Sequence, residues 1–137
     1  MKNVWFQSTC TDALGGLTIV RVAIALIIAV HPLHGLLHPA DINGFGGFLS
    51  SQGLPFGVAL AWLTIGTQVL CSLALVWGRF VVPACFGHVF ILALGLWFVH
   101  VPNGWFVVGA STGGMEFSVT LIAALFGVLW SYWPRKS

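Results

Sequence analysis

Residues 14–37 read LGGLTIVRVAIALIIAVHPLHGLL, and this stretch decides the class of protein to which the chain belongs. A helix needs about 20 predominantly apolar residues to cross the roughly 30 Å hydrocarbon core of a bilayer, and this stretch is longer than that. Thr11 and Asp12 are good helix caps just before it, and Pro39 ends a helix just after it. The sequence therefore predicts a first transmembrane helix over 14–37, long enough to cross with some tilt.

Three further apolar stretches follow, over 56–77, 81–100 and 115–133. Of the 137 residues, 58% are hydrophobic and only 6% are charged, which excludes an ordinary water-soluble domain. The predicted fold is all-α: one integral membrane domain over 1–137, an antiparallel bundle of four transmembrane helices surrounded by the lipid bilayer. The formal net charge of +2 is small and the basic residues are scattered, so we expect no nucleic-acid partner.

The basic residues predict the orientation of the bundle. Four of them fall on one side of a four-span chain: Lys2, Arg79, Arg135 and Lys136. The two loops on the other side, 38–55 and 101–114, contain neither Lys nor Arg and are expected to lie against the membrane. The positive-inside rule then places both termini in the cytoplasm, and we expect the protein in the cytoplasmic membrane of a bacterium or archaeon. The polar lead before the first span lacks a small-residue cleavage site, so that span is expected to be retained.

Three histidines stand at the outer end of the first span. His31, His34 and His38 are spaced three and four residues apart, so a helix presents them on one face, with Asp41 just beyond. Imidazole and carboxylate groups bind protons, haem or metal ions. The pattern H-x-x-H-x-x-x-H lacks a flanking carboxylate motif, so no metal site is assigned from it. The alternative is structural, because histidine tolerates a membrane interface and can bond a loop carbonyl.

His100 ends the third span and Glu116 begins the fourth, which brings both to the same outer layer as His34. We expect these three side chains to approach one another and to form a ligand or proton-transfer site. Glu116 also lies in the first turn of a helix, where exposed backbone amides favour a negative charge. That position alone is an alternative explanation for the acid.

A second, inner group of polar residues lies within the spans. Arg21 is about 10 Å along the first helix from its cytoplasmic start, and no acid occurs at that depth in another span. Its side chain either extends to lipid phosphates or turns inward toward Gln68, helix carbonyls or a ligand. His88 lies at a similar level in the third span. Gln68 should point inward, because lipid offers its amide no hydrogen bonds.

The chain resembles the DoxX family of small four-helix membrane proteins over nearly all of residues 17–130. The order of short motifs carries the resemblance: LTIVRVAIAL at 17–26, H-G at 34–35, G-L-P at 53–55, G-R at 78–79, H-V-P-N-G-W-F at 100–106 and G-G-M-E-F at 113–117. By resemblance, Arg21, His34, His100 and Glu116 fall on family motif positions. His31, His38 and His88 are features of this sequence, and Gln68 stands where the family often has a glutamate.

The resemblance implies a small subunit of a membrane redox complex, of the thiosulfate:quinone oxidoreductase or quinol-oxidase type. We expect it to bind quinone or quinol near the outer leaflet, with His34, His100 and Glu116 as the catalytic groups. The other polar residues are expected to contribute to cofactor binding: Arg21, His31, His38, Gln68 and His88. The chain has three separate cysteines and no C-x-x-C pair, so electrons would pass to or from a partner protein.

Several alternatives stay open at this point. The chain could instead be a non-catalytic membrane anchor that docks a partner, or a small transporter, although no pair of midplane carboxylates supports the latter. Binding of haem or of a metal ion is left open, as is assembly into a homo-oligomer.

Overall fold

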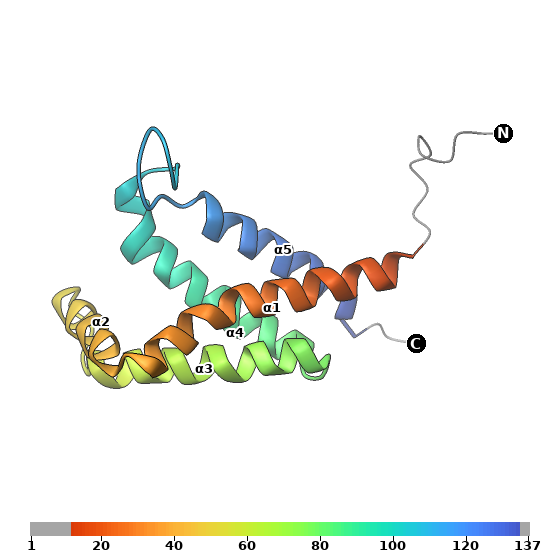
Figure 1. Cartoon of the computed structure of the whole chain (residues 1–137), viewed down its shortest axis with the longest axis horizontal. Helices are drawn as coiled ribbons and strands as arrows, with labels where there is room; N and C mark the ends of the chain where they lie inside the picture. The colour runs from red at the N-terminus through yellow and green to blue at the C-terminus, as the bar shows by residue number, and fades with distance from the viewer. Residues whose placement is uncertain (1–11, 135–137) are drawn as a thin grey trace.

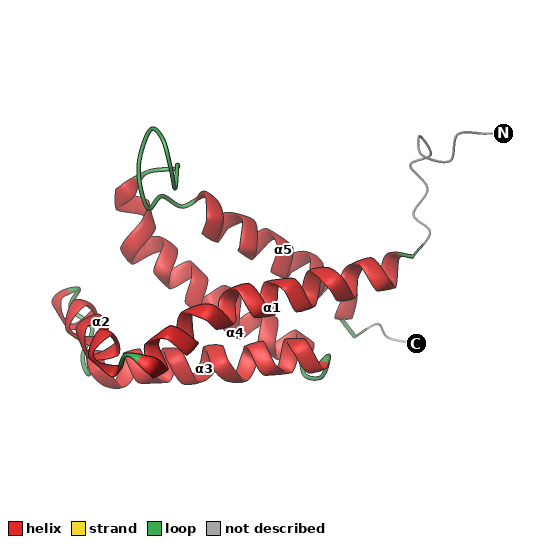
Figure 2. Ribbon diagram, in the orientation of Figure 1, coloured by secondary structure: helices red, strands yellow, loops and turns green. Residues whose placement is uncertain are grey.

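The computed structural model describes residues 12–134, and every regular element in that part of the chain is a helix. Figure 1 shows the helices in chain order, and Figure 2 shows that short loops and one longer loop connect them. The elements are α1 (Ala13–Leu37), α2 (Pro39–Ser51), α3 (Gly57–Trp77), α4 (Val81–Gly95), the π-helical turn η2 (Leu96–His100), the 3₁₀ turn η3 (Val101–Asn103) and α5 (Glu116–Tyr132).

The predicted all-α membrane fold is confirmed. Three helices are long and apolar enough to cross a membrane: α1, α3 and the continuous helical segment Val81–Asn103. Helix α5 is also apolar but has only 17 residues, about 25 Å of helix, which is at the lower limit for a spanning segment.

Helix α2 is the main departure from the sequence prediction, which treated residues 38–55 as a loop. Pro39 occupies the first turn, where its missing N–H costs little, and Asp41 places a negative charge there. The helix buries Ile42 and Leu49 against Ala61 and Ile65 of α3. The glycine-rich composition gives little local signal for a helix. The helix is stabilised by packing on α3 and not by intrinsic propensity.

The long helices pack through narrow stripes whose buried positions recur every three or four residues. On α1 these are Arg21, Ile24, Ala25, Ile28, Pro32 and Gly35, and on α3 they are Gly57, Ala61, Ile65, Gln68, Ser72 and Leu75. Helix α3 packs against α1, α2 and α4, and α5 packs against α4 and α1. The remaining apolar surface of these helices is exposed on the isolated chain, as expected for a lipid-facing surface.

The two ends of the bundle differ. The start of α1, the end of α5 and the turn between α3 and α4 lie together at one end (Figure 1), and Arg79 in that turn stacks its guanidinium 5.3 Å from the Trp77 ring centroid. Lys2, Arg135 and Lys136, used for the orientation, lie outside the described residues. At the other end, α2 lies with the end of α1 and the start of α3, whereas η2 and the loop before α5 diverge from them (Figure 1).

Candidate functional site

Arg21 is buried inside the bundle, with 7% of its surface exposed, so it does not extend to the lipid headgroups. Its Nη1 donates hydrogen bonds to the carbonyl oxygens of Leu75 and Val76 in the last turn of α3, and its guanidinium lies 5.8 Å from the Tyr132 ring centroid. A helix C-terminus carries partial negative charge and unpaired carbonyls. Arg21 thus caps α3, which explains how the bundle holds this cation without an acid at the same depth.

Gly78 makes this contact possible. It adopts a left-handed conformation, with φ of 76°, as the C-cap of α3. A Cβ at this position would lie 3.1 Å from Arg21 Nη1, so a larger residue would be strained and would crowd the guanidinium.

Gln68 and Ser72 of α3 and His88 of α4 form what we call the buried polar cluster. Their exposed fractions are 5%, 4% and 0%, and the Ser72 hydroxyl shares a 3.3 Å hydrogen bond with His88 Nε2. Gln68 is one helical turn from Ser72 on the same buried stripe. The prediction that Gln68 points inward is confirmed.

Two polar atoms of the cluster have no hydrogen-bond partner among the described residues: Gln68 Oε1 and His88 Nδ1. Such a buried, unpaired group costs about 1–3 kcal/mol. The side-chain oxygen of Gln68 is an acceptor, and His88 Nδ1 is a donor or an acceptor according to its tautomer. The cluster therefore offers unused hydrogen-bonding capacity inside an otherwise apolar core.

The cluster lies near the middle of α3 and is separate from Arg21. Gln68 is eleven residues from the start of α3 and nine from its end, or about 16 Å and 14 Å. Arg21 bonds Leu75, two turns further along α3, so it does not share one layer with Gln68 and His88 as the sequence suggested. Beside His88, α3 and α4 approach closely, since a Cβ on Gly87 would lie 2.7 Å from Cys71 Sγ.

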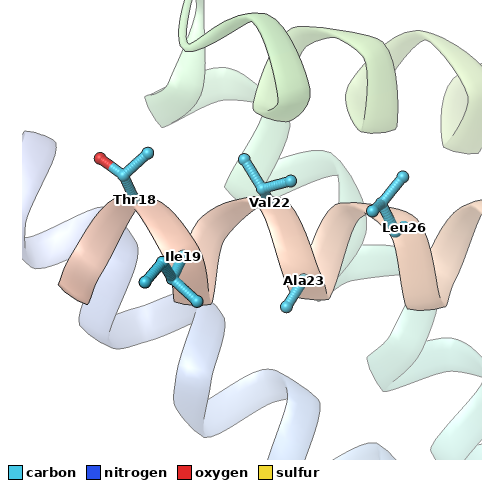
Figure 3. A pocket seen from close by; sticks show the side chains of 5 residues that line it. All are labelled: Thr18, Ile19, Val22, Ala23 and Leu26. Carbon is cyan, nitrogen blue, oxygen red and sulfur yellow. The ribbon is translucent and has the colours of Figure 1, made fainter. Parts of the chain in front are cut away.

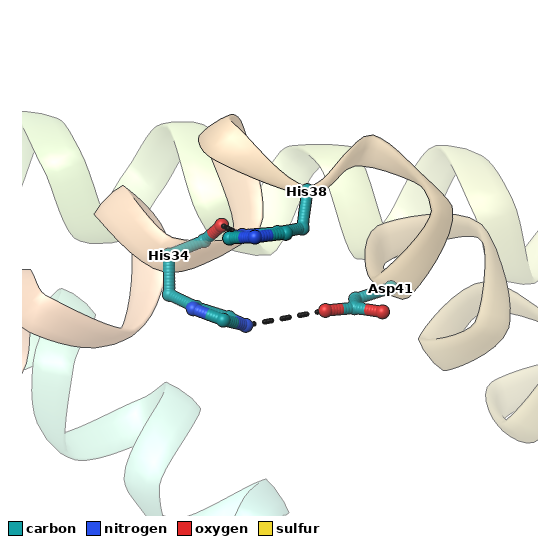
Figure 4. A group of neighbouring side chains, drawn as sticks. All are labelled: His34, His38 and Asp41. Carbon is teal, nitrogen blue, oxygen red and sulfur yellow. Dashed lines mark hydrogen bonds and ion pairs between the residues drawn. The ribbon is translucent and has the colours of Figure 1, made fainter.

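The outer histidines form a different group, shown in Figure 4. His34 Nε2 lies 3.2 Å from Asp41 Oδ2, and the rings of His34 and His38 are stacked with centroids 4.3 Å apart. His38 Nδ1 lies 3.0 Å from the carbonyl oxygen of His34. His31 is an exposed residue one turn earlier on α1 and is not part of this group.

His100 and Glu116 contact the backbone of the loop between η3 and α5. His100 Nδ1 donates to the carbonyl oxygen of Gly113 at 2.7 Å, and Glu116 Oε1 accepts from the amide of Val107 at 3.0 Å. These bonds hold the loop against the end of η2 and the start of α5. No hydrogen bond or ion pair joins these two residues to His34 within residues 12–134, and the corresponding helix ends lie apart in Figure 1. The expected convergence of His34, His100 and Glu116 is therefore not found.

A comparison with protein families assigns the chain. The model of the DoxX family matches residues 16–101. The chain belongs to the DoxX family. Searches of curated proteins and of solved structures found no match to it.

The DoxX match covers the buried polar cluster, Arg21 and the outer histidines, and it ends just after His100. Glu116 and the whole of α5 lie beyond it, whereas the sequence resemblance was drawn as far as residue 130. Ser72 is the residue of the cluster that sequence reasoning missed. Its spacing of four from Gln68 within an apolar helix was the available signal.

Two surface hollows of this DoxX protein have mainly apolar linings. One, of about 390 Å³, lies along α1 and is drawn in Figure 3; its lining residues are Thr18, Ile19, Val22, Ala23 and Leu26. A second, of about 360 Å³, is lined by Phe126, Leu129, Trp130 and Trp133 of α5. Neither is lined by an ionisable group, so they suit lipid chains and not polar chemistry.

Proposed function

We propose that this DoxX protein is a small membrane subunit of a redox complex that binds the head group of a quinone or quinol at the buried polar cluster. The observation that supports this proposal is the pair of unpartnered buried atoms, Gln68 Oε1 and His88 Nδ1, in the middle of two apolar helices. Ionisable and polar groups at this depth are costly and are typical of functional sites. The site is thus deeper than the outer layer favoured by the sequence.

The chemistry of the two side chains fits this ligand. A quinone, when bound, supplies two-electron and two-proton chemistry and presents carbonyl or hydroxyl oxygens. Gln68 Oε1 accepts a hydrogen bond from a hydroxyl. His88 Nδ1 donates to a carbonyl in one tautomer and accepts from a hydroxyl in the other, while Ser72 bonds Nε2 and holds the ring in place.

His88 is also the group best placed to exchange a proton with the ligand, because an imidazole ring can both donate and accept one. We assign Arg21 to positioning, since it holds the end of the helix that carries Gln68 and Ser72. Electrons would pass to or from a partner protein of the complex. We infer further that the membrane is the cytoplasmic membrane of a bacterium or archaeon, with both termini and Arg79 on the cytoplasmic side.

The test is quinone binding by the purified full chain in mild detergent. Copurified quinone is measured by extraction and mass spectrometry, and affinity is measured by quenching of tryptophan fluorescence with a short-chain quinone. We expect Gln68→Leu and His88→Leu each to weaken binding about tenfold, the effect of one lost hydrogen bond. Thr64→Val is the matched control, because Thr64 lies one turn from Gln68 on α3 and bonds only the Leu60 carbonyl of its own helix. Equal affinity in all three variants would contradict the proposal.

A second candidate is a non-catalytic anchor that docks a partner protein. The observation that favours it is the use of Arg21, His100 and Glu116, all of which bond backbone groups and stabilise helix ends or a loop. An anchor predicts that no quinone copurifies. It also predicts that Gln68→Leu leaves the folded protein equally or more stable, because it removes an unpaired buried amide.

A further inference from the structure

The corner between α1 and α2 is shaped by a single residue that belongs to neither helix. His38 has φ of −130° and ψ of 72°, which is outside the helical region, and it serves as the C-cap of α1 and the N-cap of α2. Pro39 disfavours a helical conformation in the residue before it, so the break falls at His38. The turn carries the first turn of α2, with Asp41, back over the last turn of α1, with His34 (Figure 4).

Three donor atoms of this corner gather within a small volume. One ring nitrogen each from His34 and His38 and one carboxylate oxygen from Asp41 all lie within 4.8 Å of one another. The side chains of His34 and Asp41 are 62% and 63% exposed on the isolated chain, so the other described residues leave them largely uncovered. Among the described residues this is the group whose donor types and spacing match a metal site.

We propose that His34, His38 and Asp41 form a binding site for a divalent transition-metal ion such as Zn²⁺. Zinc bonds to nitrogen and oxygen are about 2.0–2.2 Å long, so two ligands of a tetrahedral ion stand about 3.3 Å apart. His34 Nε2 and Asp41 Oδ2 are already 3.2 Å apart. Side-chain rotations that move the donor atoms by at most about 1.5 Å bring the most distant pair of donors to the same spacing.

The hydrogen bond of His38 prepares it as a ligand. Its Nδ1 lies 3.0 Å from the His34 carbonyl oxygen, which accepts only, so Nδ1 carries the proton in this bond. The lone pair of the neutral ring is then on Nε2, which is free to bind an ion. A backbone carbonyl that bonds the second ring nitrogen is the usual support for a metal-binding histidine.

The donor set selects the class of ion. Two imidazoles with one carboxylate suit zinc and its neighbours in the first transition row, whereas Mg²⁺ and Ca²⁺ prefer oxygen ligands. The contact between His34 and Asp41 involves only one of the two stacked rings, so it does not explain the position of the His38 ring. The ion would join the end of α1 to the start of α2 and fix the corner, and water would complete its coordination. This site shares no residue with the proposed quinone site, so each proposal can fail alone.

The experiment is a zinc titration of the full chain in detergent, purified with a streptavidin-binding tag and treated with a chelator. Isothermal titration calorimetry should show one Zn²⁺ per chain and no binding of Mg²⁺. We expect His34→Ala, His38→Ala and Asp41→Asn each to weaken zinc binding at least tenfold. His31→Ala is the matched control, since His31 is an exposed histidine one turn earlier on α1 and should retain wild-type affinity.

Three results would overturn the proposal: no saturable zinc binding, equal zinc binding by the wild type and the three variants, or an equal loss of zinc affinity in His31→Ala. Circular dichroism and gel filtration establish that each variant is folded. A measurement on the wild type alone covers the case in which a variant fails to fold. Bound Co²⁺ should show the intense visible bands of a four-coordinate ion, whereas a spectrum identical to Co²⁺ in buffer would overturn the site.

Discussion

Gly46→Ala should release α2 from α3. Gly46 is buried in α2 and faces the start of α3, where a Cβ would lie 2.5 Å from Val58 Cα and 2.8 Å from Val58 N. A backbone cannot rotate away as a side chain can, so the two helices must separate. Gly47, the next residue of the same helix, is exposed, and a Cβ added there would have no neighbour within 4 Å.

The comparison of the two glycines isolates the packing contribution. Alanine stabilises a helix by about 0.5–1 kcal/mol relative to glycine, and both variants receive this gain. Only Gly46→Ala also forces an overpacked contact, which typically costs about 1–3 kcal/mol. We therefore expect Gly46→Ala to be about 1–3 kcal/mol less stable than Gly47→Ala, with Gly47→Ala equal to or slightly more stable than the wild type.

The assay is thermal and denaturant unfolding in detergent, followed by tryptophan fluorescence, with limited proteolysis of residues 38–56 as a local measure. Gly46→Ala should unfold earlier, and its 38–56 segment should be cut faster. If Gly46→Ala and Gly47→Ala were equally stable and equally resistant to protease, the close packing of α2 on α3 would be refuted.

Two single contacts and the charge distribution give three further predictions. Arg21→Met should lower the free energy of unfolding by about 1–3 kcal/mol, because the hydrogen bonds from the guanidinium to the carbonyls of Leu75 and Val76 are lost; unfolding in detergent measures this. Glu116→Ala should loosen the loop that contains Val107 and speed its proteolysis, whereas Glu116→Gln keeps an acceptor oxygen and should resemble the wild type. Reporter fusions should place the C-terminus and the turn at Arg79 in the cytoplasm, and an outside signal from either would reverse the orientation.

The positions of the long helices could be predicted from the sequence because lipid imposes one strong condition. A spanning backbone must satisfy its own hydrogen bonds, so long apolar runs become helices. The start of α4 is at the predicted residue, and α1 begins one residue earlier than expected, at Ala13. Helix α2 escaped prediction because its stabilising contacts, such as Ile42 against the α3 residues, are tertiary and leave a weak local signal.

The candidate site could be predicted only in part. Position along a helix follows from counting residues, so the sequence placed Gln68 and His88 within long apolar helices, and both are buried in the bundle. Adjacency around the bundle does not follow from counting, and His34 and His100 at similar depth prove to be on diverging helix ends. Backbone hydrogen-bond partners could not be predicted either, because the Gly113 carbonyl that binds His100 belongs to an irregular loop.

The hydrogen-bond partners of the buried polar groups distinguish Arg21 from the buried polar cluster. Arg21 lies in the bundle interior, where α3 ends beside it and supplies carbonyl oxygens to Nη1, while its Nε has no partner among the described residues. Gln68 and His88 lie in the middle of α3 and α4, away from any helix end that could supply such carbonyls, and each keeps an unpaired atom in the part of the chain that the structure describes. An apolar side chain at either position would avoid a cost of about 1–3 kcal/mol. A ligand with complementary hydrogen bonds would offset that cost, which is the physical argument for the proposed quinone site.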